Sequence, residues 1–221
     1  MFAVIFEVQP KKERYDQYLE LARFLKPELE RIDGFIDNER FASQKVEGRV
    51  LSLSTWRDEK SVIRWRTLAV HHGVQEKGRN EVFADYHLRV GEITTDTHVP
   101  AGQSVSEQRL DTTEVGEAKT VTITEVVPHA GNELVADELN LLLGLPTGDS
   151  VLETHFFQSI YNPGKCLLLA SWKGSTVPWA PPSFSKYVKE IRHRAVRVIR
   201  DYGMFDRREA PQYYPEVRSE Q

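Results

Sequence analysis

The residues of this sequence that are best suited to proton transfer are two neighbouring histidines, His71 and His72, because imidazole titrates at about pH 6.5. His71, Gln75 and Arg79 follow at intervals of four residues, so they form one ridge if a helix extends to Arg79. His72 lies about 100° further round that helix and faces its apolar side. We therefore expect His71 at the edge of a pocket, where it could deprotonate a phenol or bind a metal or haem iron. The alternative is that the imidazole rings pack beneath the helix, with Gln75 and Arg79 in structural or solvent-exposed roles.

Aromatic residues occur where they could wall an apolar pocket beside these histidines. Trp56 ends an expected strand, and Trp65 falls on the inward face of the expected helix. The remaining wall would come from Phe2, Val4, Phe6, Phe83 and Tyr86. An apolar pocket with few polar groups suits a planar aromatic ligand. The alternative is that these side chains are ordinary core residues.

Composition limits the class of protein. The chain has 221 residues, 40% hydrophobic and 28% charged, so it can form one large domain or two small ones, each with its own core. The net charge of −4 lacks the basic excess typical of proteins that bind nucleic acids or anionic membranes. Cys166 is the single cysteine, which excludes an intramolecular disulfide and a cysteine-based metal site. With no signal-peptide pattern and no apolar stretch of about 18 residues, we expect a soluble, cytoplasmic protein.

The elements that must position these residues alternate in the first half of the chain. β-branched and aromatic runs predict strands, and apolar residues at intervals of three and four predict helices. The expected strands are residues 2–9, 35–41, 50–56 and 82–97, and the expected helices are 15–32, with a kink at Pro27, and 58–78, capped by Asp58. Gly91 in the last strand predicts a bulge or a close backbone approach. The β-α-β-β-α-β order predicts that residues 1–97 form a ferredoxin-like, split-βαβ domain.

The second half repeats this order after a linker. Residues 98–118 are rich in Gly, Ser, Thr and Glu, as expected of an exposed connection. Residues 119–206 then contain expected strands at 119–127, 151–161, 166–172 and 195–202 and helices at 134–142 and 184–191, and residues 207–221 form a tail. VLSLSTW and CLLLASW both end a strand on Trp, which favours a duplication with a degenerate second copy. We expect the basic stretch 186–200 to be a solvated helix face that runs into an edge strand.

Several motifs resemble the antibiotic biosynthesis monooxygenase (ABM) family of dimeric α+β barrels. They are FAVIF in the first strand, DGF after the first helix, SLSTW at a strand end, and WRTLAVHHGVQEKGR running into FADYHLRV. The resemblance covers residues 2–94, and the second half matches it in the order of elements and in LLLASW. In this family two ferredoxin-like units pack sheet to sheet into a barrel, usually as a homodimer. The resemblance therefore implies an α+β protein whose tandem units form the barrel within one chain, with a homodimer of fused barrels as a further assembly.

The resemblance also implies a function. Members of the family include monooxygenases that oxidise phenols or quinols with O2 and no cofactor, and haem-degrading enzymes. By this resemblance the chain would be a cofactor-independent monooxygenase that binds a small aromatic molecule and O2 in its N-terminal unit, with no metal and no nucleic-acid or membrane partner. The catalytic residues would be His71, Trp65 and Trp56, and the substrate-binding residues would be Phe6, His72, Gln75, Arg79, Phe83 and Tyr86.

Departures from the family pattern leave an alternative open. Ser52 stands where a quinone-forming member would have Asn, four residues before the strand-end Trp. A haem-degrading member would have an Asn on the first strand, which is absent here, and a wider spacing than the six residues from Trp65 to His71. The alternative to an oxygenase is a non-catalytic or haem-binding protein that uses the same cavity for storage, sensing or haem degradation. For these reasons we rank haem degradation below oxygenation of a small aromatic molecule as the predicted function.

Overall fold

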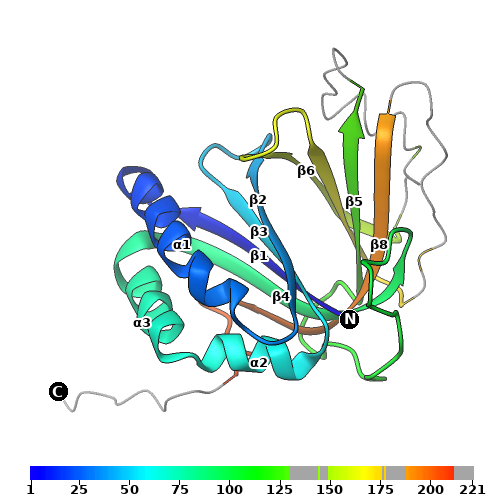
Figure 1. Cartoon of the computed structure of the whole chain (residues 1–221), viewed down its shortest axis with the longest axis horizontal. Helices are drawn as coiled ribbons and strands as arrows, with labels where there is room; N and C mark the ends of the chain where they lie inside the picture. Colours follow the sequence, from blue (N-terminus) through cyan, green and yellow to red (C-terminus); the bar gives the residue numbers. More distant parts are fainter. Residues whose placement is uncertain (130–143, 145–148, 176, 178–187, 212–221) are drawn as a thin grey trace.

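The computed structural model describes residues 1–129, 144, 149–175, 177 and 188–211, and the eight strands of this described part close into one barrel (Figure 1). The strands are β1 (Phe2–Pro10), β2 (Phe35–Ser43), β3 (Val50–Trp56), β4 (Phe83–Asp96), β5 (Thr120–Pro128), β6 (Val151–Ser159), β7 (Cys166–Trp172) and β8 (Val188–Gly203). Their order round the barrel is β1-β3-β2-β6-β7-β5-β8-β4, and neighbouring strands are antiparallel. One chain therefore supplies a whole α+β barrel.

The strands of the two halves occupy corresponding positions in the barrel. The first half runs β4-β1-β3-β2 and the second runs β8-β5-β7-β6. The halves join where β4 pairs with β8 and where β2 pairs with β6. The helix expected at 134–142 and residues 184–187 of the last expected helix lie outside the described residues. The tandem ferredoxin-like arrangement, with its boundaries at 98–118, 119–206 and 207–221, therefore stays a prediction.

The described helices all lie in the first half of the chain. They are α1 (Tyr15–Glu30), α2 (Glu59–Thr67) and α3 (Ala69–Lys77), with a 3-10 turn η1 (Lys12–Arg14) before α1 and a π-helical turn η2 (Gly78–Val82) after α3. Figure 1 shows α1, α2 and α3 on the outer side of the strands of the first half. The expected first helix is confirmed as α1, which continues past Pro27 to Glu30.

The single helix expected over residues 58–78 is wrong, because the structure breaks it at Leu68. Asp58 caps α2 as expected, since its Oδ1 accepts a hydrogen bond from the backbone N–H of Ser61 at 2.8 Å. Leu68 then adopts an extended backbone, with φ −64° and ψ 127°, between α2 and α3. Apolar residues keep their helical spacing across this break, so periodicity could not reveal it.

Two glycines are required by close approaches of the chain. Gly34, after α1, has φ +87°, and a Cβ there would lie 2.0 Å from the Oγ of Ser61. In β4, the register with β8 shifts at Gly91, where a Cβ would lie 2.4 Å from the carbonyl oxygen of Arg197. The expected bulge and close approach at Gly91 are therefore confirmed.

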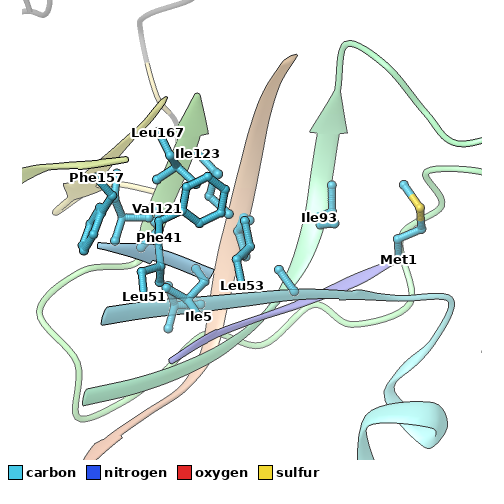
Figure 2. Packing of buried hydrophobic residues seen from close by; sticks show 14 residues of the cluster. Met1, Ile5, Phe41, Leu51, Leu53, Ile93, Val121, Ile123, Phe157 and Leu167 are labelled. Carbon is cyan, nitrogen blue, oxygen red and sulfur yellow. The ribbon is translucent and has the colours of Figure 1, made fainter. Parts of the chain in front are cut away.

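Alternation along the strands divides their side chains between the barrel interior and the outer face under the helices. Ala3 and Ile5 of β1 belong to the interior core, whereas Phe2 and Val8 pack on the outer face. Figure 2 shows side chains from both halves meeting in the interior. The buried interior residues are Met1, Ala3, Ile5, Phe41, Leu51, Leu53, Ile93, Val121, Ile123, Phe157, Leu167, Leu169, Val196 and Val198. The same alternation places Glu7 on the interior face of β1.

The expectation of a solvated helix and an edge strand at 186–200 is wrong for the described residues. From Val188 this segment is strand β8, which pairs with β4 on one side and β5 on the other. Three of its arginines form ion pairs with acids on those two neighbours: Arg192 with Asp96, Arg194 with Glu125, and Arg197 with Glu92. The paired acids allow these arginines to lie in the wall of a closed barrel.

The segment 98–118 contains neither helix nor strand, but it is not exposed throughout as expected. Thr113, Gly116 and Ala118 are buried. A Cβ on Gly116 would lie 2.6 Å from the Oδ2 of Asp201, so the segment is tightly apposed to β8. No helix in the described part of the chain combines the length and apolar character needed to cross a membrane.

Candidate functional site

Trp65 and His71 form a stacked pair where α2 gives way to α3. Their rings lie 3.9 Å apart at 16°, and the Nδ1 of His71 donates a hydrogen bond to the carbonyl oxygen of Trp65 at 2.9 Å. Burial lowers the pKa of His71 to about 4, which leaves the ring neutral near pH 7. Its Nε2 can then accept a proton, but so low a pKa makes it a weak general base. The structure therefore holds His71 in place without activating it.

Trp56 is a core residue of the outer layer. Its side chain is fully buried, and its Nε1 donates a hydrogen bond to the Oγ of Ser54 at 2.9 Å. The rings of Phe35 and Trp56 meet edge to face with their centroids 5.4 Å apart, and Trp65 packs against the same cluster. The structure thus brings Trp56 and Trp65 to one side of the sheet in dense packing.

The expected aromatic wall gathers into a second cluster of the same layer. Phe6 lies 5.9 Å from Phe83 and 5.6 Å from Tyr86, measured between ring centroids, and Tyr18 of α1 adds a further ring at 6.0 Å from Phe83. These rings meet at tilted or edge-to-face angles, which are favourable for aromatic pairs. Phe6, Phe83 and Tyr86 are therefore brought together as expected, and they pack mainly against one another.

The expected ridge of His71, Gln75 and Arg79 is not continuous. His71, His72 and Gln75 lie on α3, but that helix ends at Lys77, and Arg79 falls in the π-helical turn η2. His72 and Gln75 are partly buried. The expectation that His72 faces the core is therefore met only in part.

The larger of two described cavities lies elsewhere, at one end of the barrel. Its volume is about 530 Å³. It is lined by residues of β4, β6, β7, β8 and the adjoining loops, among them Tyr86, His87, Arg89, Gly116, Ser171, Asp201 and Tyr202. A second cavity of about 220 Å³ shares Asp85, Tyr86, His87 and Glu153 with it. Of the expected site residues, Tyr86 lines these cavities, whereas His71, Trp65 and Trp56 do not.

A buried ion pair lies beneath this end of the barrel. The Nη2 of Arg89 donates to the Oε1 of Glu7 at 2.5 Å, and its Nη1 donates to the Oγ of Ser171 at 2.8 Å. Burial alone would raise the pKa of Glu7, but Arg89 and then His155 outweigh it and hold this pKa at about 2. His155, whose Nδ1 is 3.4 Å from Glu7, also places its Nε2 2.7 Å from the Oγ of Ser43. Polar contacts therefore link strands of both halves inside the barrel.

His87 and Asp201 form a dyad at the cavity. The Nε2 of His87 donates a hydrogen bond to the Oδ1 of Asp201 at 2.6 Å, and the His87 side chain is 45% exposed. Sequence reasoning missed both residues. The available signal was the alternation of His87 and Arg89 with Leu88 and Val90 along one strand, which puts two polar residues on the interior face.

Metal-binding potential is limited in the part of the chain that the structure describes. These residues contain no group of three or more His, Cys, Asp or Glu side chains placed to hold a metal ion. Cys166 is buried, and burial raises the pKa of its thiol to about 12, which makes it a poor ligand.

One of the solved structures similar to this chain shares its fold. An aldoxime dehydratase (OxdRE), solved with butyraldoxime, matches with a TM-score of 0.52 at 12% identity and covers 90% of this chain and 79% of its own. A structure described as an antibiotic biosynthesis monooxygenase matches with a TM-score of 0.37 at 19% identity, over 41% of this chain and 95% of its own.

Sequence comparison is more specific than fold. The Antibiotic biosynthesis monooxygenase family matches residues 1–77. A relative from Pyricularia oryzae, named Jasmonate monooxygenase ABM, is 45% identical over 222 residues, which cover 97% of this chain and 99% of the relative. The similarity thus extends through the second half of the chain, beyond the region that matches the family. This chain therefore belongs to the antibiotic biosynthesis monooxygenase family.

Proposed function

We propose that this protein is a monooxygenase that transfers an oxygen atom from O2 to a small, ring-bearing organic molecule. The observation that carries the proposal is the 45% identity to a monooxygenase over nearly the full length of both chains. The described cavity of about 530 Å³ falls within the roughly 300–1,000 Å³ typical of small-molecule sites.

The first candidate substrate is a jasmonate-like molecule, since jasmonate appears in the name of that relative. Jasmonate is a cyclic ketone that carries a carboxylate and an alkenyl chain. Hydroxylation of an unactivated carbon needs two electrons besides those of the C–H bond, so this reaction would require an added reductant. Oxidation next to the ketone would not, because the enolate itself can reduce O2.

The second candidate is a phenol or quinol, which the aromatic layer of Phe6, Phe83 and Tyr86 and the stacked Trp65 and His71 favour. Such a substrate supplies both electrons once it is deprotonated, so no cofactor is needed. The pKa of about 4 for His71 weakens its case as the base. In this second candidate Trp56, Trp65 and His71 would therefore act mainly by shaping the site.

Haem fits the described residues poorly. His71 is the histidine that would ligate the iron, yet neither described cavity is lined by it. Its neighbour Trp65 covers one face of the ring, and its backbone carbonyl takes the Nδ1 proton. We therefore propose oxygenation without haem, and titration with haemin tests this: a shifted Soret band would contradict it.

The test of the function is oxygen consumption with three probes: jasmonic acid, its methyl ester and hydroquinone, each with and without a reduced nicotinamide. Incorporation of ¹⁸O from ¹⁸O2 into the product identifies a monooxygenase. Wild type and His71→Ala are compared, with heat-denatured protein as the blank. If wild type neither consumes oxygen nor labels any of the three, the proposed function is wrong for these substrate classes.

A further inference from the structure

The barrel-mouth cavity, which we define as the space lined by His87, Arg89, Leu152, Asp201 and Tyr202, borders the outer aromatic cluster, which contributes Tyr86 and Tyr202 to its wall. Its walls come from both halves of the chain: β4 from the first, and β6, β7 and β8 from the second. Arg89 is buried on its floor at 3% exposure, and its Nε has no hydrogen-bond partner among the described residues. The guanidinium of Arg89, paired with Glu7, therefore gives the cavity a polar wall.

The dyad in this cavity has the geometry of an oriented base. Because a carboxylate only accepts hydrogen bonds, the 2.6 Å contact to Asp201 puts the proton of neutral His87 on Nε2. Within the described chain, the Nδ1 of His87 has no hydrogen-bond partner and keeps its lone pair. Asp201 thus fixes the orientation of the His87 ring. His71, by contrast, has no carboxylate beside it among its hydrogen bonds.

The charge of the cavity selects among ligands. Two pairs neutralise their own charges: Arg89 with Glu7, and Arg208 with Asp206. Asp201 keeps its negative charge while its partner His87 is neutral. The acids that line the two cavities without an ion pair in the described chain are Asp85, Glu117 and Glu153, against one such arginine, Arg49. The residual negative charge disfavours an anionic ligand.

We propose that the barrel-mouth cavity binds the substrate of the monooxygenase proposed above, that the substrate is an uncharged ring-bearing ketone or phenol, and that His87 removes its proton. This inference rests on the proposed function for its use of O2. Asp201 is the positioning residue. A carboxylic acid such as jasmonate would bind less well than its methyl ester.

The step balances with O2 as the oxidant. The Nδ1 of His87 takes the proton of the acidic C–H bond beside the carbonyl, or of the phenolic O–H, and the electron pair of that bond stays on the substrate. The substrate anion forms a C–O bond to O2, and the proton returns from His87 to the terminal oxygen. The sum is R–H plus O2 giving R–OOH. Loss of water from a carbon that carries a second hydrogen then leaves a carbonyl, with one oxygen retained.

Calorimetric titration tests the site. We expect the methyl ester of jasmonic acid to bind about fivefold more tightly than the acid, with the ratio falling in high salt as charges are screened. Leu152→Trp fills the cavity and should weaken ester binding at least tenfold. Leu110→Trp is the matched control, because Leu110 is 82% exposed and lies outside the cavity. Equal weakening by both variants, or tighter binding of the acid, would overturn the site.

Deuterium exchange without oxygen tests the base. In D2O under nitrogen, wild type should catalyse exchange of the protons beside the ketone of the methyl ester, followed by NMR. His87→Gln should lower that rate about 100-fold or more while leaving the ester affinity within about threefold. His98→Gln, at an exposed histidine outside the cavity, is the matched control. Asp201→Asn should lower the rate and move its pH profile, which a purely structural effect on folding would not do.

These readouts separate the two proposals. Exchange that depends on His87, without oxygen consumption, would refute the oxygenase while keeping the site. Oxygen consumption that survives in His87→Gln and in Leu152→Trp would keep the oxygenase and refute the site. Circular dichroism and thermal unfolding of each variant exclude loss of the fold as the cause of lost exchange.

Discussion

Replacing Glu7 with Gln tests the buried ion pair inside the barrel. The change keeps the shape of the side chain but leaves the Arg89 guanidinium without its acid, and the two side chains are only 9% and 3% exposed. Breaking a buried pair costs about 3–5 kcal/mol. The pKa of Glu7 gives a second value for the stabilisation by this pair, because a fall of the pKa from 4.5 to about 2 corresponds to about 3 kcal/mol. We therefore expect Glu7→Gln to lower the free energy of unfolding by about 3 kcal/mol near neutral pH.

The loss of unfolding free energy in Glu7→Gln should depend on pH. A carboxyl group whose pKa is lowered by folding stabilises the fold above its unfolded value and stops doing so as the pH falls. The difference between wild type and Glu7→Gln should be complete above pH 4.5 and shrink between pH 4.5 and about 2. Urea unfolding followed by tryptophan fluorescence measures it, with Glu20→Gln on the exposed face of α1 as the control. A difference under about 1 kcal/mol at neutral pH, or one that stays constant on acidification, would refute the reasoning.

Three further predictions follow from single residues. Gly91→Ala should cost about 1–3 kcal/mol in urea unfolding, because its Cβ would lie 2.4 Å from the Arg197 carbonyl; a neutral effect would show that the strands can separate freely there. The His71 imidazole signals in NMR should stay in the neutral form as the pH falls from 8 to 5.5, since burial lowers its pKa to about 4; a midpoint near 6.5 would mean that it is solvated. Cys166 should not react with a thiol reagent until the protein unfolds, because burial raises its pKa to about 12, and rapid reaction of the folded protein would contradict this.

Much of the fold was predictable where local sequence decides structure. β1, α1, the hairpin of β2 and β3, and the cap at Asp58 were all expected, because each depends on residues close together in the chain. The bulge at Gly91 was predictable for the same reason. The break at Leu68 was not, since α2 and α3 keep one apolar spacing across it.

The candidate site was less predictable because its contacts join distant parts of the chain. The sequence drew attention to His71 and Trp65, six residues apart, which do meet. His87 meets Asp201 and Arg89 meets Glu7 only because the barrel closes, and no local pattern pairs them. The strand β8 was partly mistaken for a helix because its arginines resembled a solvated face, and the acids that neutralise them lie on β4 and β5.

Because one chain closes the barrel, the assembly of that barrel does not depend on the protein concentration. When two chains build such a barrel, its stability falls as the protomers are diluted, because dissociation and unfolding are coupled. Here β4 and β8, which pair from His87 to Asp96, belong to one polypeptide, so their effective concentration is set by the connecting chain and not by the solution. A cavity walled by both halves therefore stays assembled even when each molecule is alone.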